Sequence, residues 1–267
     1  MTHCVERYRA LSLTPFKHLA YAALGVLALA GAPSAYAGAV IDFESAPLGP
    51  IGSYDPVGGP TLSDVFVSNG FYVGAFTNAP KGEAGDLVAS VVDGSDVAGA
   101  CWNLACPTSA SNSSKYLASL NDGVIDIFHT SGSSFRIQSF DASFIGNYDT
   151  GTFPAGRAGV LRIQGFTALG NSLSQDFVLA GPGADGFAFA HQVTTGAFAN
   201  TDFVEFIAFA FACDTPAASS CTVFNSNRGQ FALDNIATTA AVPEPSTWLM
   251  LGAGLLAVGA ITRRRQA

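Results

Sequence analysis

The segment FVEFIAFAFA, residues 203–212, decides the fold class of this 267-residue chain. Extended backbone sends successive side chains to opposite faces of a sheet. Two alternating sets then form the two faces: Phe206, Ala208, Ala210 and Ala212 on one, and Glu205, Ile207, Phe209 and Phe211 on the other. Because both sets are mainly apolar, the segment predicts a central strand of a β-sandwich.

Similar strand-like segments recur between residues 38 and 241, separated by turn sequences such as NDG and AGPGADG. In the segment at 134–144 the alternation fails near Ser139, where we expect a β-bulge. About nine to eleven strands over some 200 residues predict an all-β fold, a single jelly-roll-like β-sandwich at 38–241. The clearest other segments are 39–44, 63–68, 70–76, 123–129, 159–169, 175–180 and 229–237.

The N-terminus predicts a secretory signal peptide at residues 1–37. Basic residues precede an apolar run at 19–31, and the AYA sequence that ends at Ala37 supplies the small residues that signal peptidase recognises. The alternative is an N-terminal membrane anchor, but the run is short for a membrane span. Cleavage after Ala37 would leave a mature chain that begins at Gly38.

The C-terminus carries a second processing signal, the motif Pro243-Glu244-Pro245. An apolar run follows at 248–261, and three arginines follow the run. A span of the bilayer usually needs about 20 apolar residues, and this run is shorter and contains three glycines. We therefore expect a short transmembrane helix that anchors the chain transiently, with the arginines on the cytoplasmic side.

Residues 242–267 resemble the PEP-CTERM sorting domain of Gram-negative bacteria, in which motif, apolar helix and arginine cluster follow in this order. The alternative is an ordinary C-terminal anchor. The resemblance implies export across the inner membrane, processing by an exosortase near the motif, and a final place at the cell surface or in the extracellular matrix. Proteins of this class are associated with exopolysaccharide and biofilm. The expected partners are therefore signal peptidase, exosortase and exopolysaccharide.

Charge narrows the range of other partners. Residues 38–241 contain 18 acidic side chains, 15 of them Asp, against six basic ones, which gives a formal charge of −12. Nucleic acid and anionic lipid both bind to basic faces, so this charge argues against both as partners. It permits divalent cations.

Four cysteines remain once Cys4 leaves with the signal peptide. In an oxidising compartment, an even number of closely spaced cysteines predicts local disulfides, here Cys101–Cys106 and Cys213–Cys221. The two other pairings of four cysteines stay open at this point. Neither spacing is typical of a metal site.

The sequence contains no strong catalytic motif. GPGADG at 181–186 satisfies a nucleotide-binding glycine spacing, but no helical pattern follows it. His129 and His191 lie in separate segments, and isolated histidines are more often structural than catalytic. We predict no catalytic residues and no enzymatic activity. A glycan-active hydrolase that uses two carboxylates from different strands is the less favoured alternative.

Acidic residues near the two ends of the domain form a candidate metal site. The segments IDFE, which includes Glu44, and FALDNI, which includes Asp234, resemble the edges of jelly-roll carbohydrate-binding modules, in which terminal strands meet and often share a calcium. The resemblance implies a structural Ca²⁺ between Glu44 and Asp234. The alternative is that both carboxylates accept hydrogen bonds from loop backbone. Gln230, Phe231 and Asp234 also resemble the signature of a QFxxD-type subfamily of PEP-CTERM proteins.

Two functions follow from these observations. The first is a non-catalytic structural or interaction component of the exopolysaccharide or biofilm matrix. The second is a lectin-like carbohydrate-binding module with structural calcium, which would need exposed aromatic rings beside polar groups. The candidates for sugar contacts are Trp102, Tyr72, Tyr116 and Tyr148.

Overall fold

The computed structural model describes residues 38–53, 65–77, 85–97, 101, 104–147, 153, 156–213, 220–225 and 228–240, with a few residues of the C-terminal segment. The predicted signal peptide, the Pro-Glu-Pro motif, Trp102 and Tyr148 lie outside these residues. All strands belong to one compact unit, Tyr36–Ala267. Within the described ranges, no helix has the length and apolar character needed to span a bilayer.

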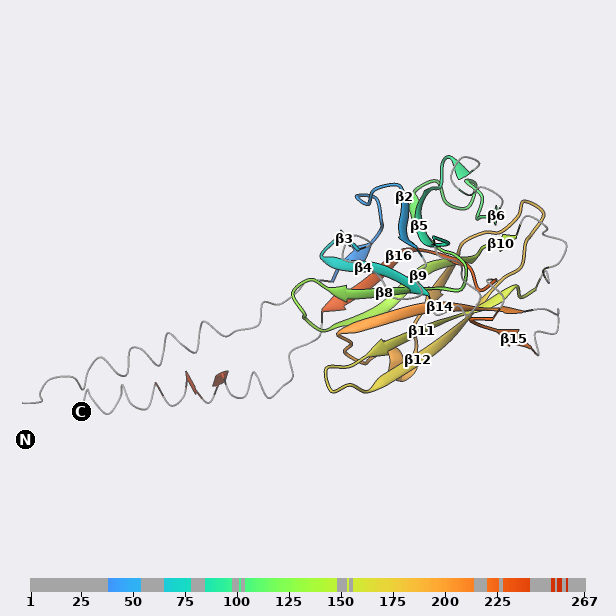
Figure 1. The fold of residues 1–267 in the computed structure, drawn as a ribbon. Helices are drawn as coiled ribbons and strands as arrows, with labels where there is room; N and C mark the ends of the chain where they lie inside the picture. Colours follow the sequence, from blue (N-terminus) through green and yellow to red (C-terminus); the bar gives the residue numbers. More distant parts are fainter. Residues whose placement is uncertain are drawn as a thin grey trace, which may run out of the picture. The chain divides into compact units, whose positions relative to one another are not determined.

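Two antiparallel sheets form a β-sandwich, which confirms the predicted fold class (Figure 1). Sheet A has the order β13-β9-β16-β7-β5-β2, and β1 also pairs with β16. Its strands are β1 (Val40–Ile41), β2 (Gly49–Ser53), β5 (Leu87–Asp93), β7 (Lys115–Ser119), β9 (Phe135–Phe144), β13 (Ala190–Val193) and β16 (Phe231–Ala240).

Sheet B has the order β12-β11-β14-β8-β4-β3, with β15 paired to β14. Its strands are β3 (Phe66–Ser68), β4 (Phe71–Thr77), β8 (Gly123–His129), β11 (Gly159–Phe166), β12 (Ser172–Leu179), β14 (Glu205–Cys213) and β15 (Cys221–Thr222). A small separate pair, β6 (Leu104–Ala105) with β10 (Gly146–Asn147), and the short helix α3 (Gly196–Ala199) complete the described elements.

Strand β14 occupies the position that its sequence predicts. It lies between β11 and β8, in the interior of sheet B. Its alternating residues Phe206, Ala208 and Ala210 are buried in the core, whereas Glu205 and Ile207 on the opposite face are partly exposed. The small alanines allow the phenylalanines of the facing sheet to fill the interior.

The irregularity expected near Ser139 is present in β9. The buried positions change from Phe135 and Ile137 to Phe140 at this point, and the pairing of β9 with β16 shifts its register there. A second shift on β16 follows Asp234, next to Asn235, whose φ of 49° is left-handed. Two bulges in adjacent strands therefore bend the middle of sheet A.

The predicted NDG turn passes the chain from sheet A to sheet B. Asn121 and Asp122 both have positive φ, 52° and 55°, and the Gly123 N–H donates to Leu120 O at 2.8 Å. A tight turn with two left-handed residues favours Asn, Asp and Gly. β7 and β8 therefore lie in different sheets although only this turn separates them.

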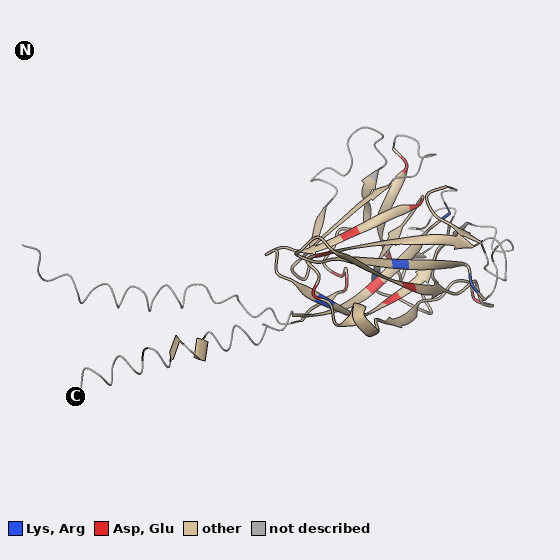
Figure 2. Ribbon diagram, turned by 90° about the horizontal axis from the view of Figure 1, so that it is seen from below, with Lys and Arg blue, Asp and Glu red and all other residues tan. Residues whose placement is uncertain are grey.

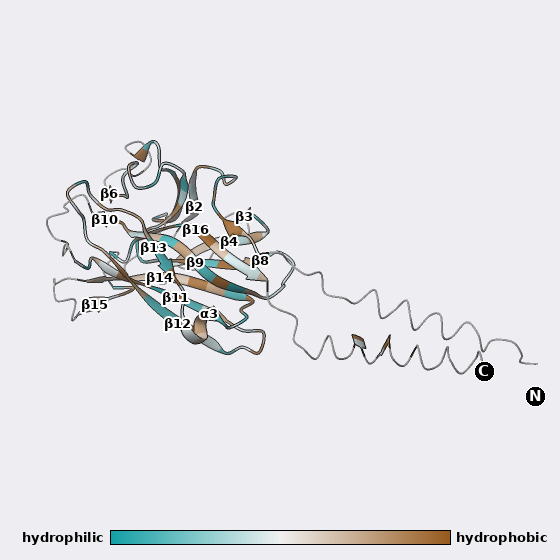
Figure 3. Cartoon of the chain, turned by 180° about the vertical axis from the view of Figure 1, so that it is seen from behind, coloured by the Kyte–Doolittle hydropathy of each residue, from teal (hydrophilic) through white to brown (hydrophobic). Residues whose placement is uncertain are grey.

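Aromatic rings connect the two sheets through the core. Phe135 of β9 packs edge-on against Phe71 of β4, with ring centroids 5.0 Å apart, and against Phe206 of β14 at 6.0 Å. All three side chains are buried. In Figure 3, much of β12 at the edge of sheet B is hydrophilic, whereas brown segments occur in strands nearer the middle of the sheets.

Replacement of Phe135 tests this contact between the sheets. Phe135→Ala should lower the free energy of unfolding by about 3–5 kcal/mol, because a buried ring is removed and a cavity is left. Leu169→Ala, at a side chain that is 88% exposed, is the control and should change it by no more than about 0.5 kcal/mol. Urea denaturation followed by circular dichroism measures both, and equal effects of the two substitutions would contradict the packing.

Candidate functional site

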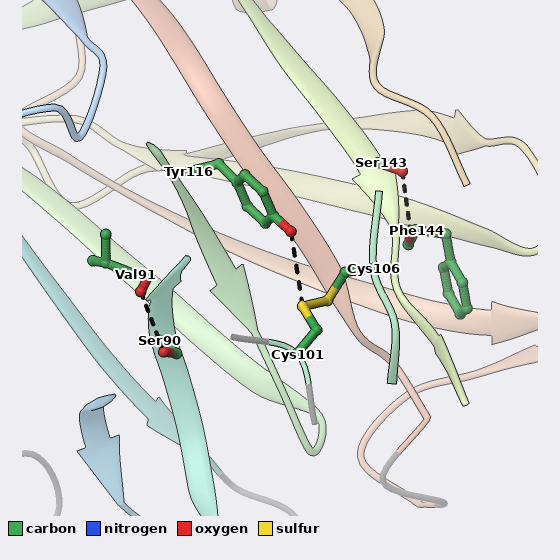
Figure 4. Close-up of a disulfide and its surroundings, with 7 residues drawn as sticks. All are labelled: Ser90, Val91, Cys101, Cys106, Tyr116, Ser143 and Phe144. Atoms are coloured by element: carbon green, nitrogen blue, oxygen red, sulfur yellow. Dashed lines mark hydrogen bonds between the residues drawn. A yellow bond between two sulfur atoms is a disulfide. The ribbon is translucent and has the colours of Figure 1, made fainter. Parts of the chain in front are cut away.

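The connection between β5 and β7 covers part of the outer face of sheet A. Outward side chains of the sheet form a second apolar cluster with residues of this connection. The predicted disulfide Cys101–Cys106 closes the connection, with the two Cα atoms 6.2 Å apart. Tyr116 of β7 points at it, and its hydroxyl donates to Sγ of Cys101 at 3.8 Å, since a disulfide sulfur has no hydrogen to donate (Figure 4).

Tyr116 is therefore not a surface residue. Its ring is fully buried, and burial raises the pKa of its hydroxyl. The prediction that Tyr116 contacts a sugar is wrong, because a strand pattern indicates which face a side chain takes but not whether a later loop covers that face. Tyr72, by contrast, is 37% exposed on sheet B.

The second predicted disulfide is also confirmed. Cys213 ends β14 and is the register partner of Cys221 in β15, with their Cα atoms 4.1 Å apart. This disulfide joins the end of β14 to the start of β15. Both disulfides hold loops locally, as the close spacing of each pair predicts.

Asp234, one of the predicted metal ligands, is buried under the β5–β7 connection. Its Oδ2 accepts hydrogen bonds from Nδ2 of Asn112 at 2.7 Å and from Oγ of Ser114 at 3.1 Å. Its Oδ1 accepts the Asn235 N–H at 2.8 Å. Burial raises the pKa of Asp234 to about 6, although these donors act to lower it. The carboxylate thus fastens the connection to β16.

A polar chain leads from Asp234 to the surface. Asp234 and Asp141 are register partners across β16 and β9. The side-chain amide of Asn235 donates to Oδ2 of Asp141 at 3.0 Å, and Nδ1 of the exposed His191 lies 2.8 Å from Oδ1 of Asp141. The left-handed backbone of Asn235 places its amide beside both carboxylates.

Glu44, the other predicted ligand, lies next to the same connection. Its Oε1 accepts the Lys115 N–H at 3.0 Å, and Nζ of Lys115 donates to the Glu44 carbonyl at 3.0 Å. The terminal strands meet as the resemblance implied, because Val40 and Ile41 of β1 pair with Ala237 and Ile236 of β16.

Hydrogen-bond donors surround Asp234 in this structure. Oδ1 of Asn112 accepts the N–H of Ser114 at 2.8 Å, which turns the amide nitrogen of Asn112 toward Asp234. The single hydroxyl hydrogen of Ser114 is shared between Oδ1 of Asn112, at 2.5 Å, and Asp234. Ca²⁺ is held by oxygen acceptors, whereas N–H and O–H groups occupy this position. The described part of the chain contains no group of three His, Cys, Asp or Glu residues that could hold a metal. The calcium site at Glu44 and Asp234 stays a prediction.

The remaining residues singled out in the sequence have structural contacts. Gln230 is buried, and its Oε1 accepts the N–H of Asn121 in the turn between the sheets at 3.5 Å, while Phe231 lies in the core. Burial lowers the pKa of His129, whose Nδ1 is 2.6 Å from the hydroxyl of Ser131. The QFxxD-type residues therefore connect β16 to the turn at Asn121, to the core and to the β5–β7 connection.

Replacement of Asp234 separates the two explanations of this residue. Asp234→Ala leaves buried donors without an acceptor, so we expect the free energy of unfolding to fall by about 2–3 kcal/mol. Asp185→Ala, at an exposed loop position, is the control. If Asp234 only accepts hydrogen bonds, the wild-type melting temperature is the same with calcium and with chelator. A fall on chelation that Asp234→Ala abolishes would contradict this and support the predicted ion.

A second group of side chains lies on the outer face of sheet B. Phe128 of β8 is the register partner of Tyr72 on one side and of Glu205 on the other. The rings of Tyr72 and Phe128 have centroids 5.2 Å apart, and each residue is 37% exposed. Asp126 lies on the same face of β8, two residues before Phe128.

Asp126 and Glu205 are carboxyl groups that lie next to each other on the neighbouring strands β8 and β14. Burial, the charge of Glu205 and a hydrogen bond between the two side chains raise the pKa of Asp126 to about 7. Oδ1 of Asp126 is buried and has no hydrogen-bond partner in the described part of the chain. Near neutral pH Asp126 is therefore partly protonated.

The sequence analysis did not single out Asp126, Glu205 or Phe128. The sequence does mark the two acids as unusual. Asp126 in GVIDIFH and Glu205 in FVEFIAFAFA are each the one acidic residue on a largely apolar strand face. The proximity of the two acids depends on which strands are neighbours, and one strand's pattern does not contain that information.

The Asp126 carboxyl should make stability depend on pH. Because its pKa is raised in the folded chain, its contribution to stability is complete below 3.8 and is lost as the pH rises through about 7. Asp126→Asn removes this loss and keeps a donor toward Glu205. We expect a gain on the order of 1–2 kcal/mol near pH 8, after allowance for partial exposure, and no gain near pH 4. Denaturation at both pH values, with Asp185→Asn as control, measures it; an equal effect at both would contradict the assignment.

Comparison with known families identifies the C-terminal segment. Residues 241–265 match the family described as PEP-CTERM protein-sorting motif. The chain therefore carries this sorting motif, as the sequence indicated. No curated protein matches the chain in sequence.

Several solved structures are similar to the sandwich. TmCBM61, solved in complex with β-1,4-galactotriose, is 8% identical, with 65% of this chain and 90% of that chain covered and a TM-score of 0.30. The CBM22-1–CBM22-2 tandem domain of Paenibacillus barcinonensis Xyn10C is 11% identical, with 80% and 49% covered and a TM-score of 0.30. A DUF4465 family protein from Bacteroides ovatus is 7% identical, with 77% and 95% covered and a TM-score of 0.34. At these scores nothing about the ligands of this chain follows from the likenesses.

Proposed function

We propose that the chain is an exported protein, processed by an exosortase, whose β-sandwich is a non-catalytic interaction component of the exopolysaccharide or biofilm matrix. The observation that carries this proposal is the sorting motif at residues 241–265, which follows β16 at once. Because the strand ends at Ala240, processing near the motif would release the whole sandwich and leave its last strand intact.

The properties of the sandwich support a place outside the cell. Its two disulfides need an oxidising compartment, and each closes a loop rather than joining distant parts of the chain. The formal charge of −12 over residues 38–241 favours solubility and disfavours nucleic acid. In Figure 2, acidic residues lie within strands as well as in loops, and basic residues are fewer.

The geometry of the acids supports a binding protein over a hydrolase. Glycosidases place two carboxyl groups on either side of a glycosidic bond, at least about 5 Å apart. Asp126 and Glu205 are hydrogen-bonded to each other, so no sugar linkage fits between them. Asp234 and Asp141 lie beside the amide of Asn235, and Asp234 is buried.

A lectin-like module is the second candidate function. The exposed rings of Tyr72 and Phe128 beside partly exposed carboxyl groups favour it, since sugars present both apolar ring faces and hydroxyl donors. In that case the module would bind carbohydrate within the matrix. The predicted structural calcium at Glu44 and Asp234 would not take part in the contacts of Tyr72 and Phe128.

Fractionation of the native host tests the proposal. We expect the protein in the extracellular matrix, with an intact mass that begins at Gly38 and lacks the segment after the Pro-Glu-Pro motif. In a host strain without exopolysaccharide, the same processed form should move to the medium. An extracellular form that keeps the apolar run and the arginines would contradict processing. Equal retention in both strains would contradict the matrix role.

A further inference from the structure

The outer face of sheet B carries a row of side chains that crosses five strands. Glu205 of β14 is paired in register with Phe166 of β11 and with Phe128 of β8. The row continues from Phe128 to Tyr72 of β4 and from Tyr72 to Val67 of β3. Since adjacent strands lie about 4.8 Å apart, it extends over about 19 Å. We call these five residues the aromatic row.

The aromatic row offers apolar surface to an extended ligand. Val67 is 49% exposed, and Tyr72 and Phe128 are each 37% exposed. The two rings are tilted by 43° and form one continuous surface. Partly exposed apolar groups in line favour a partner with repeated apolar faces, such as the ring faces of successive sugars.

The same row presents negative charge. Glu205 lies in the row, is partly exposed and is hydrogen-bonded to Asp126 on the neighbouring strand β8. Two carboxyl groups at one place repel each other unless a proton or another cation lies between them. A ligand that brings an ammonium group to this point would pair with the partly exposed Glu205 and offset this repulsion.

Charge also disfavours an acidic polysaccharide. Arg162 is the nearest basic side chain on this face that the structure describes, in the adjacent strand β11, and it forms an ion pair with Asp176, with Nε and Oδ1 2.6 Å apart. The domain as a whole is strongly negative. The face thus complements a positive ligand and repels a negative one.

We propose that the aromatic row, together with Asp126, binds an amino-sugar polysaccharide whose sugar rings pack on Tyr72 and Phe128 and whose ammonium groups pair with Glu205. This proposal rests on the proposed matrix function and names the kind of polymer that the sandwich binds. A neutral polysaccharide would make the ring contacts alone.

Calorimetry with the exported protein from its host tests the site. The probes are a deacetylated chito-oligosaccharide, its N-acetylated form, a cello-oligosaccharide and an alginate oligomer, at about pH 6, where the amino groups are protonated. We expect the deacetylated probe to bind about tenfold more tightly than the two neutral probes, as one charge-assisted pairing allows, and alginate not to bind. Equal or tighter binding of a neutral or acidic probe would overturn the assignment.

Variants assign the binding to the aromatic row. Glu205→Gln should weaken the deacetylated probe about tenfold and leave the N-acetylated probe unchanged. Tyr72→Ala should weaken both about three- to tenfold. Val178→Ala is the matched control, because Val178 is 46% exposed on the same sheet but outside the row. A single cooperative melting transition verifies that each variant folds.

The two proposals can fail separately. If Glu205→Gln and Tyr72→Ala bind every probe like the wild type, the site is wrong. If these variants also stay in the matrix of the host, the matrix function stands without this site. If the wild type binds the deacetylated probe but is never retained in the matrix, the site stands and the proposed function is wrong.

Discussion

Phe231–Leu233 of β16 pair with β9 on one side and with β7 on the other, and further along the strand Ile236 and Ala237 pair with β1. The last described strand thus lies between strands that come much earlier in the sequence (Figure 1). β16 joins the two parts of sheet A, because β9 and β7 do not pair with each other in the described structure. The contacts of Asp234 with the β5–β7 connection depend on this position of β16.

At its bulge, β16 leaves the regular pairing of the sheet and contacts the connection that covers the sheet. Asn235 leaves the regular ladder with a left-handed backbone, and Asp234 before it reaches the covering connection through Asn112 and Ser114. A buried carboxylate is tolerated there because neutral donors surround it. The disulfide Cys101–Cys106 then restricts the connection that Asp234 holds. The outer face of sheet A is consequently covered over β5, β7 and the start of β16, whereas sheet B carries the exposed rings of Tyr72 and Phe128.

The sequence predicted the parts of this structure that depend on local pattern. Strand β14, the bulge near Ser139, the turn at Asn121 and the two disulfides are encoded by neighbouring residues. Tyr116 was misjudged because its burial depends on a connection that folds back over β7. Asp126 and Glu205 were missed because their contact requires β8 and β14 to be neighbours, although they are 79 residues apart in the chain. The alternation of residues in a strand predicts which face of the sheet each side chain takes. Which side chains of other strands lie beside it depends on the order of the strands in the sheet.

The sorting motif follows β16 directly, so the position of β16 between other strands bears on where the chain can be processed. The motif begins directly after the strand that completes the sandwich, so a cut nearer the N-terminus would remove strand residues. Native-state hydrogen exchange of the exported protein tests the central role of β16 most directly. The account predicts that the amides of Phe231–Leu233 exchange only through global unfolding, with a higher free energy of opening than amides of the edge strand β12. Exchange of these amides at a lower free energy than those of β12 would contradict it.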